Sequence, residues 1–266
     1  MRPFPPQEFA DRVTRIKQLM SERGVDVLLL SDANNMYWTT GYTETGFYHK
    51  TFVLVALEDD QPIWIGREFT CAPAARLTTY LPEDHIVTYN EKFATHFAGL
   101  LGSADEGQAG GDAMTVVANY IKERGWDKAR IGTEESSGLL PYRYGANFQA
   151  SLPDADFIDA TELVDSLRRV KSPLEIQVLR QAALIADASM RSTIAAVKPG
   201  ARECDVAAEV FRSCVAGTDR FGGFYPEGVV VNRGRRLEAL HSNWTDEKIE
   251  EGELVSVELA GSRFGY

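Results

Sequence analysis

Long apolar runs are missing from this 266-residue sequence. The longest, at 27–30 and 52–57, have the length of strands and fall far short of the roughly 18 uncharged apolar residues that cross a membrane. The amino-terminal residues 1–6 are rich in proline and lack the apolar core of a signal peptide. These absences predict a cytoplasmic protein without a membrane partner.

Cysteine and positive charge are also scarce. The three cysteines, Cys71, Cys204 and Cys214, have no metal-type spacing, and in a reducing compartment an odd number predicts buried thiols. Lys and Arg number 28 against 39 Asp and Glu, which gives a net charge of −11. A chain of this charge repels phosphate backbones, so no nucleic acid is expected as a partner.

Several enzyme motifs are absent as well: the P-loop pattern, GxSxG, HExxH and CxxC. Only four histidines are present. His85 and His96 are expected to be structural or solvated, whereas His49 and His241 have neighbours that favour a functional role.

What the first part of the sequence does contain is an alternation of strand and helix patterns. Apolar strand patterns lie at 25–30, 51–57, 63–66, 86–89, 130–134 and 156–158. Helical patterns lie at 9–20, 31–38, 70–80, 113–124 and 142–150. Such alternation predicts an α/β domain with a mostly parallel sheet and helices on both of its faces.

The pattern changes at Lys171, where Ser172, Pro173 and Glu175 form a capping box with proline at the first helical position. A long helix is therefore expected to begin there. Its expected apolar stripe consists of Ile176, Leu179, Ala183, Ala186, Met190, Ile194 and Val197.

A second helix at 203–216 and strands at 228–232 and 252–261 follow in the pattern. Because a domain averages about 150 residues, the chain is predicted to form two domains, residues 1–165 and 166–266.

Several segments, in this order, resemble the creatinase/prolidase (M24) family, whose catalytic domain is the pita-bread fold. They are NNMYWTTGY from Asn34, KSPLEI from Lys171, KPG from Lys198, the isolated His241 and GELVSVE from Gly252. The resemblance implies an α/β fold: an N-terminal creatinase-like domain with a mostly parallel mixed sheet, followed by the first half of a pita-bread α+β domain. The chain is then expected to stop within the catalytic domain and to be inactive alone.

The resemblance also implies the catalytic residues. His241 matches a histidine that contacts substrate in the family's peptidases and is the acid/base in creatinase. Glu258, 258 − 241 = 17 positions later, stands where the family usually has an aspartate of a two-metal centre. Alternation along the strand puts Glu258 on the polar face with Ser256. Without the resemblance, His241 would more simply be a hydrogen-bonded structural residue and Glu258 a solvated one.

The glutamate in place of aspartate bears on the cofactor. Its extra methylene displaces a carboxylate that must hold metal with sub-ångström tolerance. This favours the metal-free branch that contains creatinase and the ectoine hydrolases, and hence no cofactor. The alternative is a pair of divalent metals such as Mn or Co, with most ligands beyond Tyr266.

Residues 46–50 are similar to the loop by which creatinase reaches into its partner subunit. Phe47 and His49 match the phenylalanine and arginine that bind the substrate carboxylate there, so they are expected to bind substrate in a homodimer. The missing arginine removes the bidentate clamp that a guanidinium provides. An ordinary hairpin edge with scattered aromatics is the alternative for this segment.

Three functions stay open. The leading hypothesis is a C–N hydrolase that acts on a small amidine or amidino compound of the ectoine or creatine type. A metal-dependent Xaa-Pro peptidase and a non-catalytic binding member of the fold are the alternatives. The adjacent Glu134 and Glu135 resemble a carboxylate pair, but neighbouring strand residues point to opposite faces, so no joint acid/base role is expected.

Overall fold

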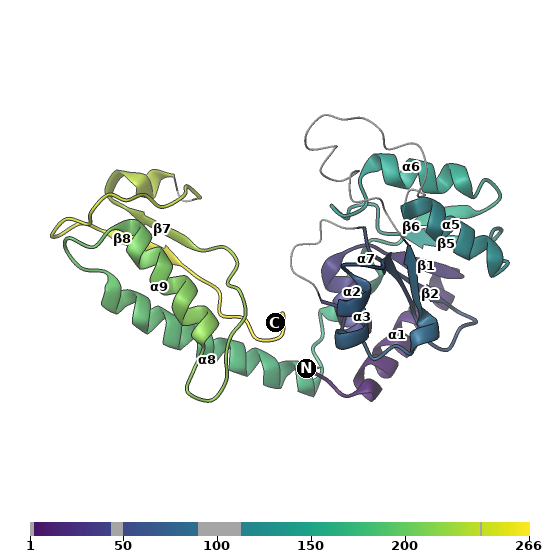
Figure 1. Cartoon of the computed structure of the whole chain (residues 1–266), viewed down its shortest axis with the longest axis horizontal. Helices are drawn as coiled ribbons and strands as arrows, with labels where there is room; N and C mark the ends of the chain where they lie inside the picture. Colours follow the sequence, from purple (N-terminus) through teal and green to yellow (C-terminus); the bar gives the residue numbers. More distant parts are fainter. Residues whose placement is uncertain (1–2, 44–49, 90–112, 240) are drawn as a thin grey trace. The chain divides into compact units, whose positions relative to one another are not determined.

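The computed structural model of the chain describes residues 3–43, 50–89, 113–239 and 241–266. The chain divides into two compact units, Met1–Val170 and Lys171–Tyr266 (Figure 1). Each unit has its own elements and its own core. None of the described helices combines the length and apolar character that a membrane crossing requires.

A six-stranded sheet with the order β4-β3-β2-β1-β5-β6 forms the centre of the first unit. Its strands are β1 (Val27–Leu30), β2 (Phe52–Ala56), β3 (Ile63–Arg67), β4 (Ile86–Tyr89), β5 (Arg130–Thr133) and β6 (Asp156–Asp159). Strand β2 pairs antiparallel with both neighbours, and the remaining pairs are parallel. The predicted mostly parallel mixed sheet is confirmed.

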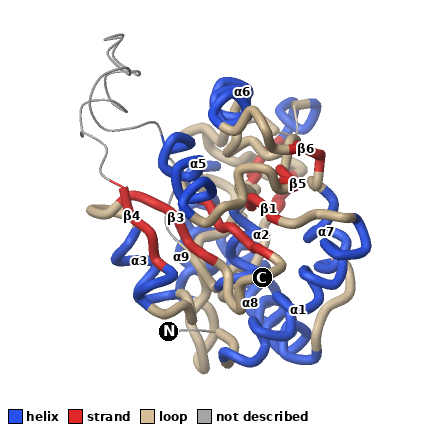
Figure 2. Tube along the Cα trace, turned by 90° about the vertical axis from the view of Figure 1, so that its right-hand side faces the viewer, coloured by secondary structure: helices blue, strands red, loops and turns tan. Residues whose placement is uncertain are grey.

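Helices cover both faces of this sheet (Figure 2). One face packs against α1 (Pro6–Arg23), α2 (Ala33–Thr40), α3 (Ala72–Thr78) and α7 (Glu162–Arg168). The other face packs against α5 (Ala113–Glu123) and α6 (Tyr142–Ser151). A short 3-10 turn, η1 (Glu83–His85), precedes β4.

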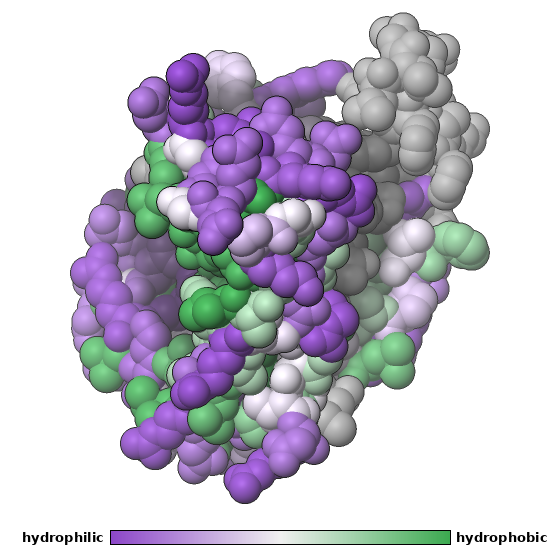
Figure 3. Space-filling view, turned by 90° about the vertical axis from the view of Figure 1, so that its left-hand side faces the viewer, coloured by the Kyte–Doolittle hydropathy of each residue, from purple (hydrophilic) through white to green (hydrophobic). Residues whose placement is uncertain are grey.

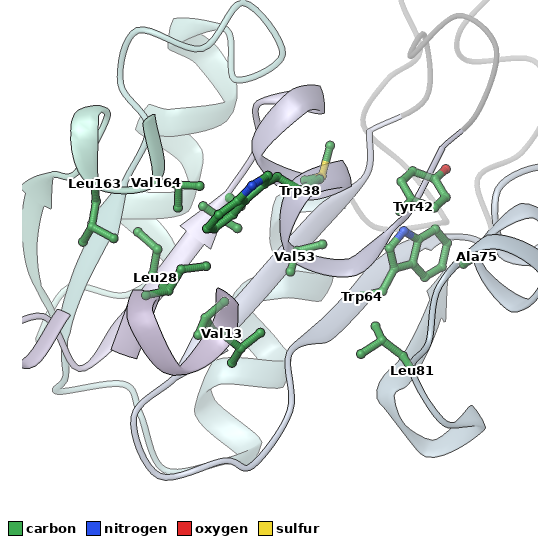
Figure 4. Close-up of a cluster of buried hydrophobic side chains, with 14 of the residues drawn as sticks. Val13, Leu28, Trp38, Tyr42, Val53, Trp64, Ala75, Leu81, Leu163 and Val164 are labelled. Atoms are coloured by element: carbon green, nitrogen blue, oxygen red, sulfur yellow. The ribbon is translucent and has the colours of Figure 1, made fainter. Parts of the chain in front are cut away.

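Strand β1 contributes alternate side chains to the two hydrophobic cores, one on each face of the sheet. Leu28 and Leu30 enter the core on the α1 side, shown in Figure 4, while Val27 and Leu29 enter the core on the α5 side. Side chains alternate between faces along a strand, so an uninterrupted apolar run is needed where both faces are covered. Each such side chain contributes about 1.5–3 kcal/mol when it is fully buried.

Helix α7 was not predicted. Its seven residues are too few for a clear helical period, yet Leu163 and Val164 are buried in the core on the α1 side. The predicted boundary between 165 and 166 falls inside this helix, which lies wholly within the first unit.

The second unit consists of two helices and a two-stranded sheet. Helices α8 (Pro173–Ala196) and α9 (Glu203–Ala216) pack together, and β7 (Val230–Arg233) pairs antiparallel with β8 (Val255–Glu258). A 3-10 helix, η2 (Gly234–Glu238), follows β7. The predicted capping box is confirmed: Glu175 N donates to Ser172 Oγ at 3.2 Å, and Ser172 N donates to the Glu175 carboxylate at 2.7 Å.

The predicted apolar stripe of α8 was wrong. Ile176 and Ile194 are exposed, and the buried residues of the helix are Glu175, Val178, Ala182, Ile185, Ser189 and Thr193. Small side chains on a helix let its backbone approach a neighbour closely, so the buried side need not be the most apolar one. Large apolar side chains of this unit, among them Leu184 and Leu254, are exposed. Figure 3, which views one face of the molecule, shows apolar patches between hydrophilic ones.

Candidate active site

The β7–β8 hairpin has two different faces. Its register pairs Val230 with Glu258 and Asn232 with Ser256, and residues directly opposite one another share a face. The other face carries Val231, Val255 and Val257, which pack with Val206 and Ala207 of α9. The face that bears Glu258 is thus the one turned away from α9, and the Glu258 side chain is exposed there.

His241 lies in a turn that follows η2, and its side chain is exposed. Ser242 N donates to Ala239 O at 2.9 Å, which closes the turn. We call Ala239 together with residues 241–243 the His241 loop. An exposed imidazole on a closed turn is free to meet a small molecule while its backbone is held.

Two side chains bind the His241 loop from the hairpin side. Asn232 on β7 is fully buried; its Oδ1 accepts from Ser242 Oγ at 3.0 Å and its Nδ2 donates to Ala239 O at 3.4 Å. Arg236 of η2 donates through Nη2 to Ser242 Oγ at 3.0 Å and also to Asn243 O. The loop is therefore attached to the same hairpin that carries Glu258.

A buried carboxylate lies behind this loop. Glu203, the first residue of α9, has no exposed surface and accepts from Thr245 N and Thr245 Oγ1, both at 2.7 Å. Its Oε1 faces Arg236 Nε at 3.4 Å and Arg233 Nε at 3.9 Å. A buried carboxylate needs such partners because its charge has lost water.

Arg233 connects this carboxylate to the turn before β8. Its guanidinium binds Glu253 and Glu247, each at 2.6 Å, and the hydrogen bond with Glu253 raises the pKa of Arg233. A hydrogen bond from Glu250 N and the Arg233 guanidinium hold the pKa of Glu253 below its usual value. We call Glu203, Arg233 and Arg236 the charged cluster; it fixes the position of Thr245 and of the His241 loop together.

Within residues 3–43, 50–89, 113–239 and 241–266, no group of three or more His, Cys, Asp or Glu side chains is placed to hold a metal ion. The expectation that the protein uses no cofactor stays a prediction.

Phe47 and His49, the predicted substrate-binding residues, lie outside the described residues. Their role stays a prediction. Cys71 and Cys214 are buried, Cys204 is partly buried, and none of the three is in a disulfide.

A second polar cluster, in the first unit, was missed by the sequence reasoning. Glu134 follows β5 and is 2% exposed; its carboxylate accepts from Ser31 N and Asp32 N at 2.6 Å and from Asn35 Nδ2 at 2.7 Å. Arg168 Nη1 donates to Asn35 Oδ1 at 2.7 Å and so ties α7 to α2.

Burial raises the pKa of Glu134 to about 7, although the N–H groups of Asp32 and Ser31 oppose the rise. Glu135 is exposed, and both glutamates lie beyond the end of β5, so strand alternation is not what separates them. Asp32 caps α2 by accepting from the main-chain N–H groups of Asn34 and Asn35. This cluster joins the ends of β1 and β5 to α2, which is a structural role.

The fold of the two units is that of the prolidases. A solved Xaa-Pro dipeptidase from Bacillus anthracis is similar to 95% of this chain with a TM-score of 0.69 and 22% identity, and the chain covers 61% of it. Its likeness establishes the architecture, in which the second unit is part of the pita-bread fold.

Two family models match the chain: the creatinase/prolidase N-terminal domain at residues 12–170 and metallopeptidase family M24 at residues 177–266. Since the first match alone spans more than half of the residues, the chain belongs to the creatinase/prolidase family.

Relatives of known sequence agree with this membership. The ectoine hydrolase of Halomonas elongata is 31% identical over 265 residues, 97% of this chain and 63% of that protein. An uncharacterized hydrolase/peptidase of Sinorhizobium fredii is 31% identical over 264 residues, 99% of this chain and 64% of that protein. The chain thus spans somewhat less than two thirds of these relatives' length. That it stops within the catalytic domain stays a prediction, which these matches do not establish.

Proposed function

We propose that the protein is a hydrolase of C–N bonds that acts on a small amidine or amidino compound of the ectoine or creatine type, without a metal ion. The observation that carries the proposal is the attachment of the His241 loop to the hairpin that bears Glu258. The likeness to an ectoine hydrolase supports the substrate class.

His241 acts as the proton shuttle in this proposal. An imidazole ring has one nitrogen that can accept a proton and one that can donate a proton. It accepts a proton from the water that attacks the amidine carbon and returns one to the nitrogen that leaves. Glu258 is the second polar group at the substrate, where its carboxylate accepts hydrogen bonds from amidine N–H groups.

The test is the hydrolysis of ectoine and of creatine by the purified full-length protein, followed by NMR. His241→Ala is expected to lower kcat by about 10²–10⁴-fold, the range of general acid–base catalysis. His85→Ala is the matched control, because His85 lies in the first unit beside Asp84. Equal rates in the wild type and His241→Ala would exclude the shuttle role.

One observation favours a second candidate, a metal-dependent Xaa-Pro peptidase: residues 177–266 match the metallopeptidase family model. Stoichiometric Mn, Co or Zn in the purified full-length protein, with cleavage of Xaa-Pro dipeptides that a chelator abolishes, would replace the first proposal by this one. Failure to turn over either substrate class would favour the binding member of the fold.

The partners follow from the same proposal. A small molecule is the ligand, a second copy of the chain is the partner that receives Phe47 and His49, and neither nucleic acid nor a membrane takes part. Sedimentation of the full-length protein as a monomer would contradict the homodimer.

A further inference from the structure

Asn232 makes contacts that ordinary strand residues do not make. It is fully buried on β7 and bonds to both ends of the turn that contains His241, to Ala239 O on one side and to Ser242 Oγ on the other. The turn has a main-chain closure of its own, from Ser242 N to Ala239 O. Asn232 is therefore not needed to form the turn, but it fixes where the turn lies.

The chemistry of the two bonds calls for an amide. One partner is a carbonyl oxygen that needs a donor, and the other is a hydroxyl that donates to Oδ1; a carboxylate would offer two acceptors and an aliphatic side chain neither. A buried amide left without partners is unfavourable, so the loop and Asn232 hold each other.

The strand that carries Asn232 is itself fixed. β7 pairs with β8 over four residues, and Val231, its neighbour on the opposite face, is buried against α9. Asn232 is opposite Ser256, and Ser256 and Glu258 follow each other on one face of β8. Among the residues of β7, Asn232 thus links the histidine-bearing loop to the strand face of Glu258.

We propose that Asn232 is a positioning residue that fixes the His241 loop against the β7–β8 hairpin and so sets the place of the His241 imidazole relative to Glu258. This inference rests on the proposed function for its catalytic consequence, but not for its structural one. A reacting group is commonly held within about 0.5 Å of its productive position by neighbouring residues that contact the group but not the substrate.

The structural consequence is tested by hydrogen exchange in the full-length protein. Asn232→Ala is expected to speed amide exchange at 241–243 by at least tenfold while α9 changes little. Val206→Ala is the matched control, because it weakens the core on the opposite face of the hairpin and leaves both Asn232 bonds in place. Unchanged exchange at 241–243 in Asn232→Ala, or a change no greater there than in α9, would overturn the proposal.

The catalytic consequence is tested by a double-mutant cycle on kcat. Asn232→Ala is expected to lower kcat about tenfold with little change in KM, and Asn232→Asp, whose second carboxylate oxygen faces the acceptor Ala239 O at a buried position, is expected to lower it at least as much. The double variant Asn232→Ala/His241→Ala should be no slower than His241→Ala alone, because Asn232 acts through His241. Additive losses in the cycle would overturn the proposal.

The two tests separate the two hypotheses. If His241→Ala leaves turnover unchanged while Asn232→Ala still loosens 241–243, the proposed function fails and the positioning of the loop stands. If His241→Ala abolishes turnover while exchange at 241–243 is unaffected by Asn232→Ala, the function stands and the positioning role fails.

Discussion

Glu134 in the first unit and Glu203 in the second are both buried glutamates, and they are held differently. Among the described residues, the hydrogen-bond partners of Glu134 are neutral: the N–H groups of Ser31 and Asp32, the Ser31 hydroxyl and the Asn35 amide. Glu203 accepts from Thr245 and also faces the guanidinium groups of Arg233 and Arg236.

This difference separates a structural carboxylate from one that organises a candidate site. With neutral donors only, burial dominates at Glu134, which is why its pKa is raised to about 7. At Glu203 the carboxylate fixes cationic side chains, one of which, Arg236, also donates to the His241 loop. The first cluster joins strands to a helix, and the second joins a helix to the loop that carries His241.

The largest expected effect comes from Glu203→Gln, which keeps shape and removes charge. The amide NH₂ of this variant faces the guanidinium groups of Arg233 and Arg236. Hydrogen-bond donors and positive charges then face one another at a buried position, which is unfavourable. Removing one partner of a buried ion pair lowers the free energy of unfolding by about 3–5 kcal/mol. Because Arg236 is 30% exposed, we expect a loss of about 2–3 kcal/mol here. The measurement is hydrogen exchange in α9 under native conditions, with Glu247→Gln as the control on the exposed side of Arg233. If Glu203→Gln and Glu247→Gln speed hydrogen exchange in α9 equally, the buried Glu203 contributes no more than the exposed partner of Arg233.

The charged cluster also shows where sequence reasoning stopped. His241 and Glu258 were named because their spacing resembles a family pattern, but Asn232 and Glu203 carry no motif. The one available signal was the basic run from Arg233 to Arg236 next to an apolar strand, since buried or half-buried arginines require acidic partners. Which acid pairs with them depends on a contact between α9 and η2 that no local pattern encodes.

More of the fold than of the candidate site could be predicted from the sequence, for physical reasons. Uninterrupted apolar runs such as 27–30 predict strands covered on both faces, and the capping box at Ser172 marks a helix start by its own chemistry. Helical spacing could not choose between neighbouring stripes on α8, because 178, 182, 185 and 189 have the same period as the predicted positions. Packing against α9 made that choice.

A smaller effect is expected from Glu134→Gln. The amide oxygen can still accept from Ser31 N and Asp32 N, but the NH₂ group meets Asn35 Nδ2, and Asn35 cannot turn because Arg168 holds its Oδ1. One lost bond and one unsatisfied buried donor cost about 1–2 kcal/mol. Urea unfolding followed by tryptophan fluorescence measures it, and the neighbouring exposed Glu135→Gln is the control, expected within about 0.5 kcal/mol of wild type. A loss for Glu134→Gln as large as that for Glu203→Gln would show that cations are not what distinguishes the two sites.

The smallest effect is the pH dependence that Glu134 imposes on stability. Its pKa rises from an ordinary 4.5 in the unfolded chain to about 7 in the folded one, because burial disfavours the charged form. Between these values the folded state binds more protons, so the free energy of unfolding falls as pH rises. The contribution is fully present below about pH 4.5 and is lost as pH passes through 7, with a loss of about 1 kcal/mol between pH 6 and pH 8. Unfolding free energies at pH 6, 7 and 8 should show this slope in wild type and in Glu203→Gln but not in Glu134→Gln; the same slope in all three proteins would assign the titration to another group.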